Sequence, residues 1–396
     1  MTLEEARDEI LKIESPNILC ELPTSFGKTR IALDIMRKRF PISNIQEPIK
    51  ILIVVPRLVL IDNWKDEFKK WKAEDYLIYV EFVTYASFHK KVGVWDLVIF
   101  DEVHHLSARC RELVGNYFFT KNCIMLSATV SRDMKLELNN LFLDLYIYKV
   151  TARKAIEEKI LPDPKVYLIP LNLDKNDARY QIIKNKSQKI ELRVSYNQRF
   201  NYTKVKNRKI VIKCTQKQYY DDMSSMIAWY KKKAGSRMKT LFLRKSGERL
   251  KWLSNEKSAF VHMLLSFLSK QRTLTFCNGI DQTEQLGTYC INSKNTKQSI
   301  KNLIDFNNGT INHITACNML DEGVNLVNCR VGVYAVLNSS ERMITQKLGR
   351  LLRHPKPIII IPYYKDTREE EIVKTMLENY NPELVEEIDK LIDLKL

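Results

Sequence analysis

Residues 17–29, Asn-Ile-Leu-Cys-Glu-Leu-Pro-Thr-Ser-Phe-Gly-Lys-Thr, form the stretch that decides the fold of this chain. The apolar run at Asn17–Leu22 predicts a strand, and the amphipathic stretch at Arg30–Phe40 predicts a helix. The loop between them ends in Gly-Lys-Thr, and such a loop cradles phosphate groups with its backbone N–H groups and with the helix N-terminus. We expect Lys28 to reach the β- and γ-phosphates and Thr29 to ligate Mg²⁺; the other loop residues are Pro23, Thr24, Ser25, Phe26 and Gly27.

Short apolar runs alternate with helical stretches before residue 150 and again between residues 265 and 365. Strands that are apolar throughout and separated by helices indicate a parallel sheet covered on both faces. We predict an α/β fold with two parallel-sheet domains, 1–150 and 151–366, and an acidic, helical tail at 367–396. Strands are expected at Ile49–Val55, Leu77–Val83, Trp95–Phe100, Cys123–Leu126, Val166–Leu173, Thr273–Cys277, Ile311–Cys317, Val331–Leu337 and Pro357–Pro362, with a further helix at Leu58–Lys72.

The net charge is confined to one segment. The formal charge is +17 at pH 7, and residues 1–174 and 261–396 each sum to zero, so residues 175–260 carry all of it. This basic insertion has a mostly helical pattern apart from Ile210–Cys214, and its basic runs lie at Lys204–Lys209 and Lys231–Lys239 among tyrosines and tryptophans. Clustered cations suit a polyphosphate through counterion release, which predicts nucleic acid as the partner. A solvated basic segment with no partner is the alternative.

A second polar constellation follows the strand predicted at Trp95–Phe100. Four apolar residues, 97–100, end in Asp101 and Glu102, and His104 follows two positions later. The carboxyl end of a parallel strand is where α/β sites form. We expect Asp101 to hold Mg²⁺ through its water shell and Glu102 to orient and deprotonate an attacking water. An acidic strand end with no catalytic role is the alternative, and pairing with the phosphate loop disfavours it.

The second domain carries a basic helix face. Gln346, Arg350 and Arg353 stand at positions i, i+4 and i+7, so they share one face of a helix. Two arginines presented in this way suit a γ-phosphate bound by the other domain.

The ordered set of motifs resembles that of superfamily 2 helicases. Gly27-Lys28-Thr29, Asp101–His104 and Ser127-Ala128-Thr129 resemble motifs I, II and III, while Thr273–Asn278, Met319–Leu326 and Gln346–Arg353 resemble motifs IV, V and VI. The resemblance implies two RecA-like domains that bind ATP with Mg²⁺. It implies catalytic roles for Lys28, Asp101, Glu102, Gln346, Arg350 and Arg353, ATP contacts by Gly323 and Asn325, and coupling of the ATP site to nucleic acid by His104, Ser127, Ala128 and Thr129.

The stretch Val55–Trp64, followed by Trp71, looks like motif Ia of the XPB-like and UvsW-like DNA helicases, and Val83–Ser87 looks like their motif Ib. By that resemblance the nucleic-acid contacts are Arg57, Thr84 and Thr315, to which the basic insertion adds Lys231, Lys232 and Lys233. Trp64 and Trp71 stand seven apart on an amphipathic helix, which favours core packing over base stacking. The chain departs from the family pattern at Ser25, where Gly is usual, and at Asn325, where Asp is usual.

The sequence therefore predicts an ATP-dependent DNA helicase or branch-remodelling translocase that acts on single-stranded, duplex or branched DNA. An RNA helicase, and a nucleic-acid clamp that uses ATP only as a switch, stay open as alternatives. The eight cysteines lack zinc-ligand spacing and lie in apolar contexts, which predicts buried thiols in a reducing compartment. We expect a cytoplasmic monomer in a bacterial or infected host cell, with no membrane partner, because no apolar run approaches the roughly 18 residues of a membrane span.

Overall fold

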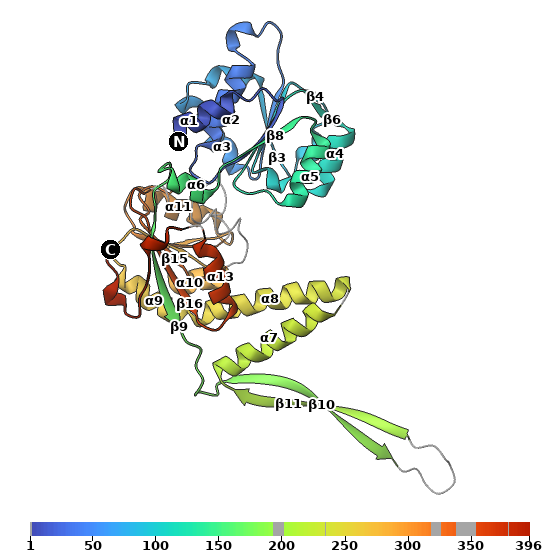
Figure 1. Ribbon diagram of the computed structural model, residues 1–396, viewed down its shortest axis with the longest axis vertical. Coiled ribbons are helices and arrows are strands. Elements are labelled where there is room, and N and C mark those ends of the chain that lie inside the picture. Colours follow the sequence, from blue (N-terminus) through green and yellow to red (C-terminus); the bar gives the residue numbers. More distant parts are fainter. Residues whose placement is uncertain (1, 193–201, 234, 318–325, 338–353, 379) are drawn as a thin grey trace. The chain divides into compact units, whose positions relative to one another are not determined.

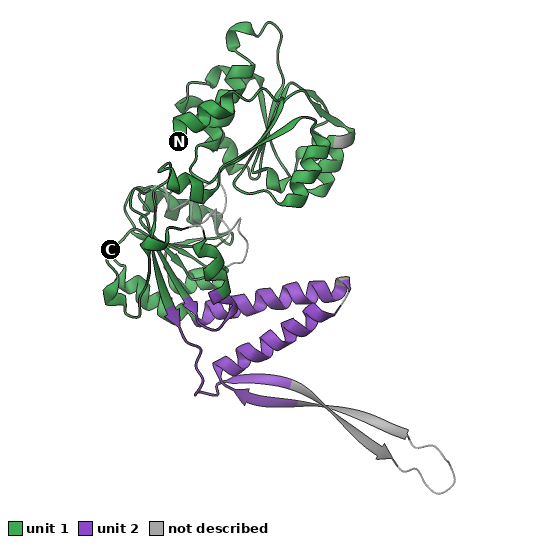
Figure 2. Cartoon of the chain, viewed as in Figure 1, with its two compact units in different colours: residues 1–169, 257–362, 371–396 green, residues 170–256, 363–370 purple. Residues whose placement is uncertain are grey.

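The computed structural model describes residues 1–396 except 1, 193–201, 234, 318–325, 338–353 and 379 (Figure 1). The chain divides into two compact units (Figure 2). Unit 1 comprises residues 1–169, 257–362 and 371–396 and contains one parallel sheet and most of a second, and unit 2 comprises residues 170–256 and 363–370. The α/β fold with two parallel sheets is confirmed.

The first sheet has six strands in the order β3-β2-β5-β7-β1-β8, and every neighbouring pair is parallel. Its central strands are buried along their whole length, as continuous apolar runs require. The strands are β1 Asn17–Glu21, β2 Ile51–Val55, β3 Val80–Thr84, β5 Leu97–Asp101, β7 Cys123–Ser127 and β8 Leu145–Lys149, and β4 Gly93–Trp95 pairs separately with β6 Phe118–Thr120. The helices are α1 Leu3–Leu11, α2 Lys28–Arg39, α3 Val59–Lys70, α4 Ala108–Asn116 and α5 Arg132–Leu141.

The predicted strands and helices of this region are found with small changes at their ends. The run predicted at Leu77–Val83 starts later, because Glu74–Tyr79 forms a 3₁₀ turn before β3. Strand β8, with the sequence Leu-Tyr-Ile-Tyr-Lys, is an addition that was not predicted, and in the structure it is half-buried to exposed. Further 3₁₀ turns lie at Ile42–Asn44, Phe88–Lys90 and Val103–His105.

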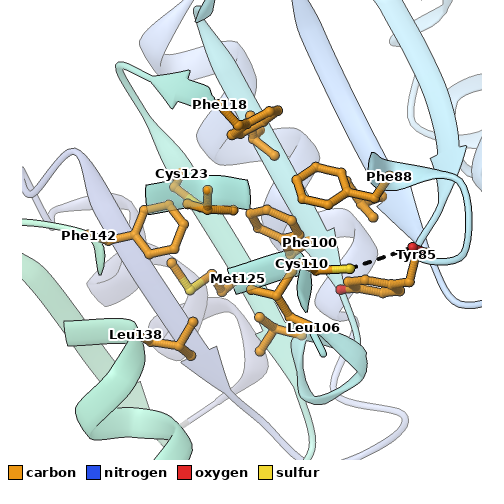
Figure 3. Packing of buried hydrophobic residues seen from close by; sticks show 14 of the residues in the cluster. Tyr85, Phe88, Phe100, Leu106, Cys110, Phe118, Cys123, Met125, Leu138 and Phe142 are labelled. Atoms are coloured by element: carbon orange, nitrogen blue, oxygen red, sulfur yellow. Dashed lines mark hydrogen bonds between the residues drawn. The ribbon is translucent and has the colours of Figure 1, made fainter. Parts of the chain in front are cut away.

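Aromatic side chains fill the core on one side of this sheet (Figure 3). The ring of Phe100, which is fully buried, lies 5.6 Å from Phe88, 6.2 Å from Phe142 and 6.3 Å from Tyr85, measured between ring centroids. The thiol of Cys110 donates to the carbonyl oxygen of Tyr85 at 3.8 Å. Strand β5 is thereby held rigidly just before its two terminal carboxylates.

The second sheet has seven strands in the order β13-β14-β12-β15-β16-β9-β17. Its strands are β9 Lys165–Leu171, β12 Thr273–Phe276, β13 Cys290–Ile291, β14 His313–Ala316, β15 Val331–Tyr334, β16 Ile358–Tyr364 and β17 Val385–Glu387. The helices are α6 Ala152–Glu157, α9 Ser258–Phe267, α10 Ile280–Leu286, α11 Thr296–Asn307 and α13 Arg368–Leu377, with 3₁₀ turns at Pro382–Leu384 and Leu391–Asp393. The tail is helical only at its start. The expectation of helix is wrong for β17, which pairs in parallel with β9.

The basic insertion is a β-hairpin followed by two helices. Strands β10 Tyr180–Leu192 and β11 Tyr202–Cys214 pair antiparallel from Tyr180 opposite Cys214, and helices α7 Gln216–Lys232 and α8 Ser236–Glu256 follow. The prediction of a mostly helical insertion holds for α7 and α8. It is wrong for the hairpin, of which the prediction had set only Ile210–Cys214 apart from the helical pattern. Lysines at alternate positions produce little apolar periodicity, so a solvated hairpin is hard to recognise from its pattern.

Several aromatic residues of unit 2 form a small core. The rings of Tyr180, Tyr219 and Trp252 lie 5.3–5.8 Å apart, and Tyr220 packs with Leu173, Leu253 and Tyr364. These residues therefore stabilise the insertion itself. Trp229 differs, because 51% of its surface is exposed.

Seven of the eight cysteines are buried, as predicted, and Cys290 is half-buried. Within the part of the chain that the structure describes, no helix combines the length and the apolar character needed to cross a bilayer.

Replacing Phe100 by Ala should lower the free energy of unfolding of the first sheet by about 3–5 kcal/mol, because it empties the centre of the aromatic core. Phe119→Ala is the matched control, because Phe119 is 57% exposed, and we expect a change within about 0.5 kcal/mol. Hydrogen exchange of β5 amides in increasing urea measures both. Equal effects of the two substitutions would contradict this description of the core.

Candidate active site

Three neighbouring parallel strands bring the predicted residues to one edge of the first sheet. Strand β7 lies between β5 and β1, with Asp101 opposite Leu126 and Glu21 opposite Ser127. Because the strands are parallel and in register, the segments that follow them leave at the same edge. The N–H of Leu22 donates to the carbonyl oxygen of Ser127 at 2.9 Å, which ties the start of the phosphate loop to the end of β7.

The loop between β1 and α2 has the backbone of an anion cradle. Ser25 and Gly27 both have positive φ angles, 70° and 81°, while the buried ring of Phe26 anchors the loop between them. Gly27 is the N-cap of α2 and has no side chain that could cap its first N–H groups. A helix N-terminus of this kind attracts phosphate. Ser25 therefore adopts the left-handed conformation that the family's usual Gly adopts without strain.

Lys28 lies between the loop and the acidic pair. Its Nζ is 3.3 Å from the carbonyl oxygen of Leu22, to which it donates, and 3.6 Å from Oε1 of Glu102. Both charged side chains are about nine-tenths buried, at 11% and 12% exposure. Two of the predicted catalytic residues therefore lie together in the structure: the cation of the phosphate loop contacts the carboxylate that follows β5.

The residues predicted to couple the site to nucleic acid gather around the other oxygen of Glu102. Ser127 Oγ lies 3.4 Å from Glu102 Oε2, 3.0 Å from His104 Nδ1 and 3.1 Å from the carbonyl oxygen of Thr129. His104 Nδ1 is itself 3.4 Å from Glu102 Oε2. Ala128 is buried beside them. A rotation of the Ser127 hydroxyl would therefore change the hydrogen bonds of both Glu102 and His104.

Asp101 is held by two aromatic side chains that the prediction did not include in the site. The indole Nε1 of Trp64 donates to Asp101 Oδ2 at 3.0 Å, and the hydroxyl of Tyr85 donates to the carbonyl oxygen of Asp101 at 2.9 Å. Burial, together with the nearby carboxylates of Asp101 and Glu102, raises the pKa of Tyr85 well above its usual value, so the hydroxyl stays a donor. Trp64 is buried, as predicted for a core residue. The sequence could indicate this hydrogen bond only in a general way, because a buried indole N–H needs an acceptor but the pattern does not say which one.

Glu21 is a third residue that sequence reasoning did not assign to the site. Its side chain is almost fully buried at the end of β1, where it pairs with Lys135 and lies 3.5 Å from the ammonium group of Lys149. It also accepts from the N–H of Val130 at 3.4 Å. Glu21 thereby joins β1, α5 and β8 one residue before the phosphate loop.

The donor set fits a magnesium–nucleotide complex. Mg²⁺ prefers hard oxygen ligands and retains several waters, which suits the carboxylate of Asp101 and the hydroxyl of Thr29 in the first turn of α2. The uncapped N-terminus of α2 and the ammonium group of Lys28 suit the phosphates. Gly323, Asn325, Gln346, Arg350 and Arg353, predicted to complete the site, lie outside the described residues.

The predicted nucleic-acid contacts are placed differently from one another. Arg57 is exposed just after β2, and Thr84 is half-buried at the end of β3. Thr315 is fully buried in β14, and its hydroxyl donates to the carbonyl oxygen of Thr283 at 3.0 Å. The hydroxyl of Thr315 is therefore used inside the sheet, and a nucleic-acid contact by Thr315 stays a prediction. Lys231, Lys232 and Lys233 are exposed at the C-terminal end of α7, and the run Lys204–Lys209 has side chains outside the described set.

Comparison with known proteins identifies the class. Residues 3–132 match the family described as "Type III restriction enzyme, res subunit", and residues 248–355 match "Helicase conserved C-terminal domain". Together these two matches contain the first sheet's phosphate loop and acidic pair and most of the second sheet. The chain belongs to the superfamily 2 helicases, and the resemblance seen in its motifs is confirmed.

The chain is distantly similar to a DNA 3'-5' translocase, XPB2 of Sulfurisphaera tokodaii. The two are 25% identical over 357 residues, which cover 84% of this chain and 74% of the relative. Among solved structures, a Dbp5 variant from S. cerevisiae bound to RNA and ADP BeF3 has a TM-score of 0.59 at 10% identity, covering 98% of this chain and 89% of that one. The Hef helicase domain of Pyrococcus furiosus has a TM-score of 0.51 at 12% identity, covering 94% and 97%. The structural likeness concerns the fold.

The strain at Ser25 is testable by comparing two variants that both lack its hydroxyl. Ser25→Gly should be more stable than Ser25→Ala by about 1 kcal/mol, because only Gly adopts a φ of 70° without a Cβ clash. Urea unfolding of the two proteins, without nucleotide, measures the difference. Equal stability would mean that the loop does not hold residue 25 in the left-handed region.

Proposed function

We propose that this chain is a DNA-stimulated ATPase that couples ATP hydrolysis to translocation on DNA, and thereby to unwinding or remodelling of duplex or branched DNA. The observation that carries the proposal is the contact between Lys28 and Glu102 at the edge of the first sheet, 3.6 Å apart and beside Asp101. A cation that can reach phosphate and a carboxylate that can accept a proton from water are the two groups that hydrolysis of a phosphoanhydride needs most.

Each residue of the site has a task in this reaction. Lys28 and the N-terminus of α2 bind the β- and γ-phosphates, and Thr29 and Asp101 hold Mg²⁺, which supplies charge neutralisation on the phosphate oxygens when bound. Glu102 orients the attacking water and accepts its proton. Because Lys28 and Glu102 contact each other here, binding of the γ-phosphate would draw the ammonium group away and leave the carboxylate to the water. By the family resemblance, Gln346, Arg350 and Arg353 would also contribute to the site, as would Gly323 and Asn325.

Sequence similarity and charge both favour DNA as the substrate. A relative whose sequence similarity covers 84% of this chain is a DNA translocase. The charge distribution supports nucleic acid independently, because the exposed lysines of α7 lie in the only strongly basic segment of the sequence. Arg57 and Thr84, which follow or end adjacent strands, are the proposed contacts of the first sheet.

Two substitutions test the chemistry of the site. Lys28→Ala should abolish ATP turnover and weaken ATP binding, because it removes the phosphate-binding cation. Glu102→Gln should lower turnover by a factor of about 10²–10⁴ while ATP still binds, because the amide keeps the shape and loses the base. Steady-state ATPase rates and equilibrium binding of labelled ATP separate the two effects. Turnover that persists in both variants would refute the site.

The choice of nucleic acid is tested by ATPase stimulation. Wild-type protein should respond mainly to DNA in a panel of single-stranded DNA, duplex DNA, a four-way junction and RNA, with Glu102→Gln as the inactive control. Strongest stimulation by single-stranded DNA would indicate strand tracking, and strongest stimulation by the four-way junction would indicate branch remodelling. Preference for RNA would replace DNA as the substrate and leave the motor intact, whereas tight DNA binding without stimulation would favour the ATP-switched clamp.

The basic insertion is tested through the salt dependence of DNA binding. Replacing Lys231, Lys232 and Lys233 by Gln should weaken binding to all sequences alike and reduce the slope of log K against log salt by about 1 for each lysine that neutralises a phosphate. The matched control replaces Lys270, Lys297 and Lys301, three exposed lysines of unit 1. An unchanged slope in the first variant would show that the lysines serve only the C-terminal end of helix α7.

A further inference from the structure

The buried indole N–H of Trp64 has a carboxylate of the candidate site as its acceptor. The residue lies in the middle of α3 with 2% of its surface exposed, and its ring packs 6.3 Å from that of Phe68. Its indole N–H donates to Asp101 Oδ2 at 3.0 Å. The chain thus places a large, buried aromatic side chain against the carboxylate that the proposed function assigns to Mg²⁺.

Both the side chain and the main chain of Asp101 are fixed from outside β5. Trp64 on α3 holds the carboxylate, and the Tyr85 hydroxyl holds the carbonyl oxygen at 2.9 Å. Tyr85 is itself fixed, because its N–H donates to the carbonyl oxygen of Val55 at 3.1 Å and its ring stacks on Phe100. Aromatic donors from two other segments therefore fix Asp101, one through its carboxylate and the other through its main-chain carbonyl oxygen.

We propose that Trp64 is a positioning residue for the magnesium site: its indole N–H fixes the carboxylate plane of Asp101 and so raises the affinity of the site for the metal. The inference rests on the proposed function, because it needs Asp101 to hold Mg²⁺. Its physical basis is general. Groups that hydrogen-bond a metal-holding carboxylate orient it in advance, and losing one typically costs about 10–100-fold in metal affinity or activity.

The same helix supplies a matched control. Trp71 caps the C-terminal end of α3, and its indole N–H donates to a carboxylate too, Glu67 Oε2, at 2.6 Å. That pair is half-buried, and Arg30 of α2 stacks on the Trp71 ring at 4.1 Å. Trp71→Phe therefore removes the same chemical group from a carboxylate that has no part in the site.

The decisive measurement is metal binding rather than turnover. The full chain with bound ADP is titrated with Mn²⁺, and free Mn²⁺ is followed by electron paramagnetic resonance. We expect Trp64→Phe to raise the Kd for Mn²⁺ on the order of 10-fold and Trp71→Phe to leave it unchanged. The Mg²⁺ concentration that gives a half-maximal ATPase rate should rise by a similar factor in Trp64→Phe. The value of kcat at saturating Mg²⁺ should change by a smaller factor.

Two results overturn the proposal: an Mn²⁺ affinity of Trp64→Phe equal to wild type, or an equal loss in Trp71→Phe. Failure of the proposed function looks different, because wild-type protein itself would then neither bind Mn²⁺ with ADP nor hydrolyse ATP.

A second measurement tests the positioning role of Trp64 if Trp64→Phe does not fold. The wild-type chain has five tryptophans, so ¹⁵N-indole labelling gives five N–H resonances, and single Phe variants of Trp71, Trp95, Trp229 and Trp252 assign the fifth to Trp64. Addition of Mg²⁺ to the ADP-bound protein should shift the Trp64 resonance, because the acceptor carboxylate changes its charge environment, and should leave Trp71 in place. A Trp64 resonance that does not respond to Mg²⁺ overturns the proposal.

Discussion

The register of three parallel strands, β5, β7 and β1, is the constraint on which the rest of the site depends. These strands pair residue by residue, so the ends carrying Asp101, Ser127 and Glu21 meet at one edge. The side-chain period of a strand is two, and a slip of one residue would turn each of these side chains to the opposite face. The register is protected by burial: the strands are apolar almost throughout, and Phe100 is locked among other aromatic rings directly before the acidic pair.

The site stores strain and buried charge that this rigid sheet can tolerate. Ser25 and Glu102 both have left-handed backbones, with φ of 70° and 50°, and conformations of this kind cost about 1–3 kcal/mol each. The Lys28–Glu102 pair is largely withdrawn from water, so each charge depends on the other. Such features persist only where the surroundings over-determine them. Here a tertiary frame holds them: Leu22 is bonded to Ser127, and Asp101 is bonded to Trp64 and Tyr85.

The chain separates its chemistry from its charge. The segments that build the two sheets are electrically balanced overall, and the insertion carries the whole excess of +17. In unit 2, Tyr180, Tyr219 and Trp252 pack together in a small core, while lysines such as Lys231–Lys233 are exposed. This division suits a motor whose ATP site needs local, paired charges and whose nucleic-acid grip needs many cations at the surface.

The sequence by itself determined the two α/β sheets, the phosphate loop and the acidic pair, because a short local pattern encodes each of them. Apolar runs encode the strands, the Gly-Lys-Thr turn encodes the loop, and two carboxylates at a strand end form the acidic pair. Residues 180–214 were harder, since a solvated lysine-rich hairpin lacks the apolar period of a buried strand. Only the tertiary structure decided that Thr315 is buried, that β17 joins β9, and that Trp64 bonds Asp101 across 37 positions of sequence. Local pattern encodes which element forms, whereas the partner of a side chain is chosen by packing between elements that lie far apart in the chain.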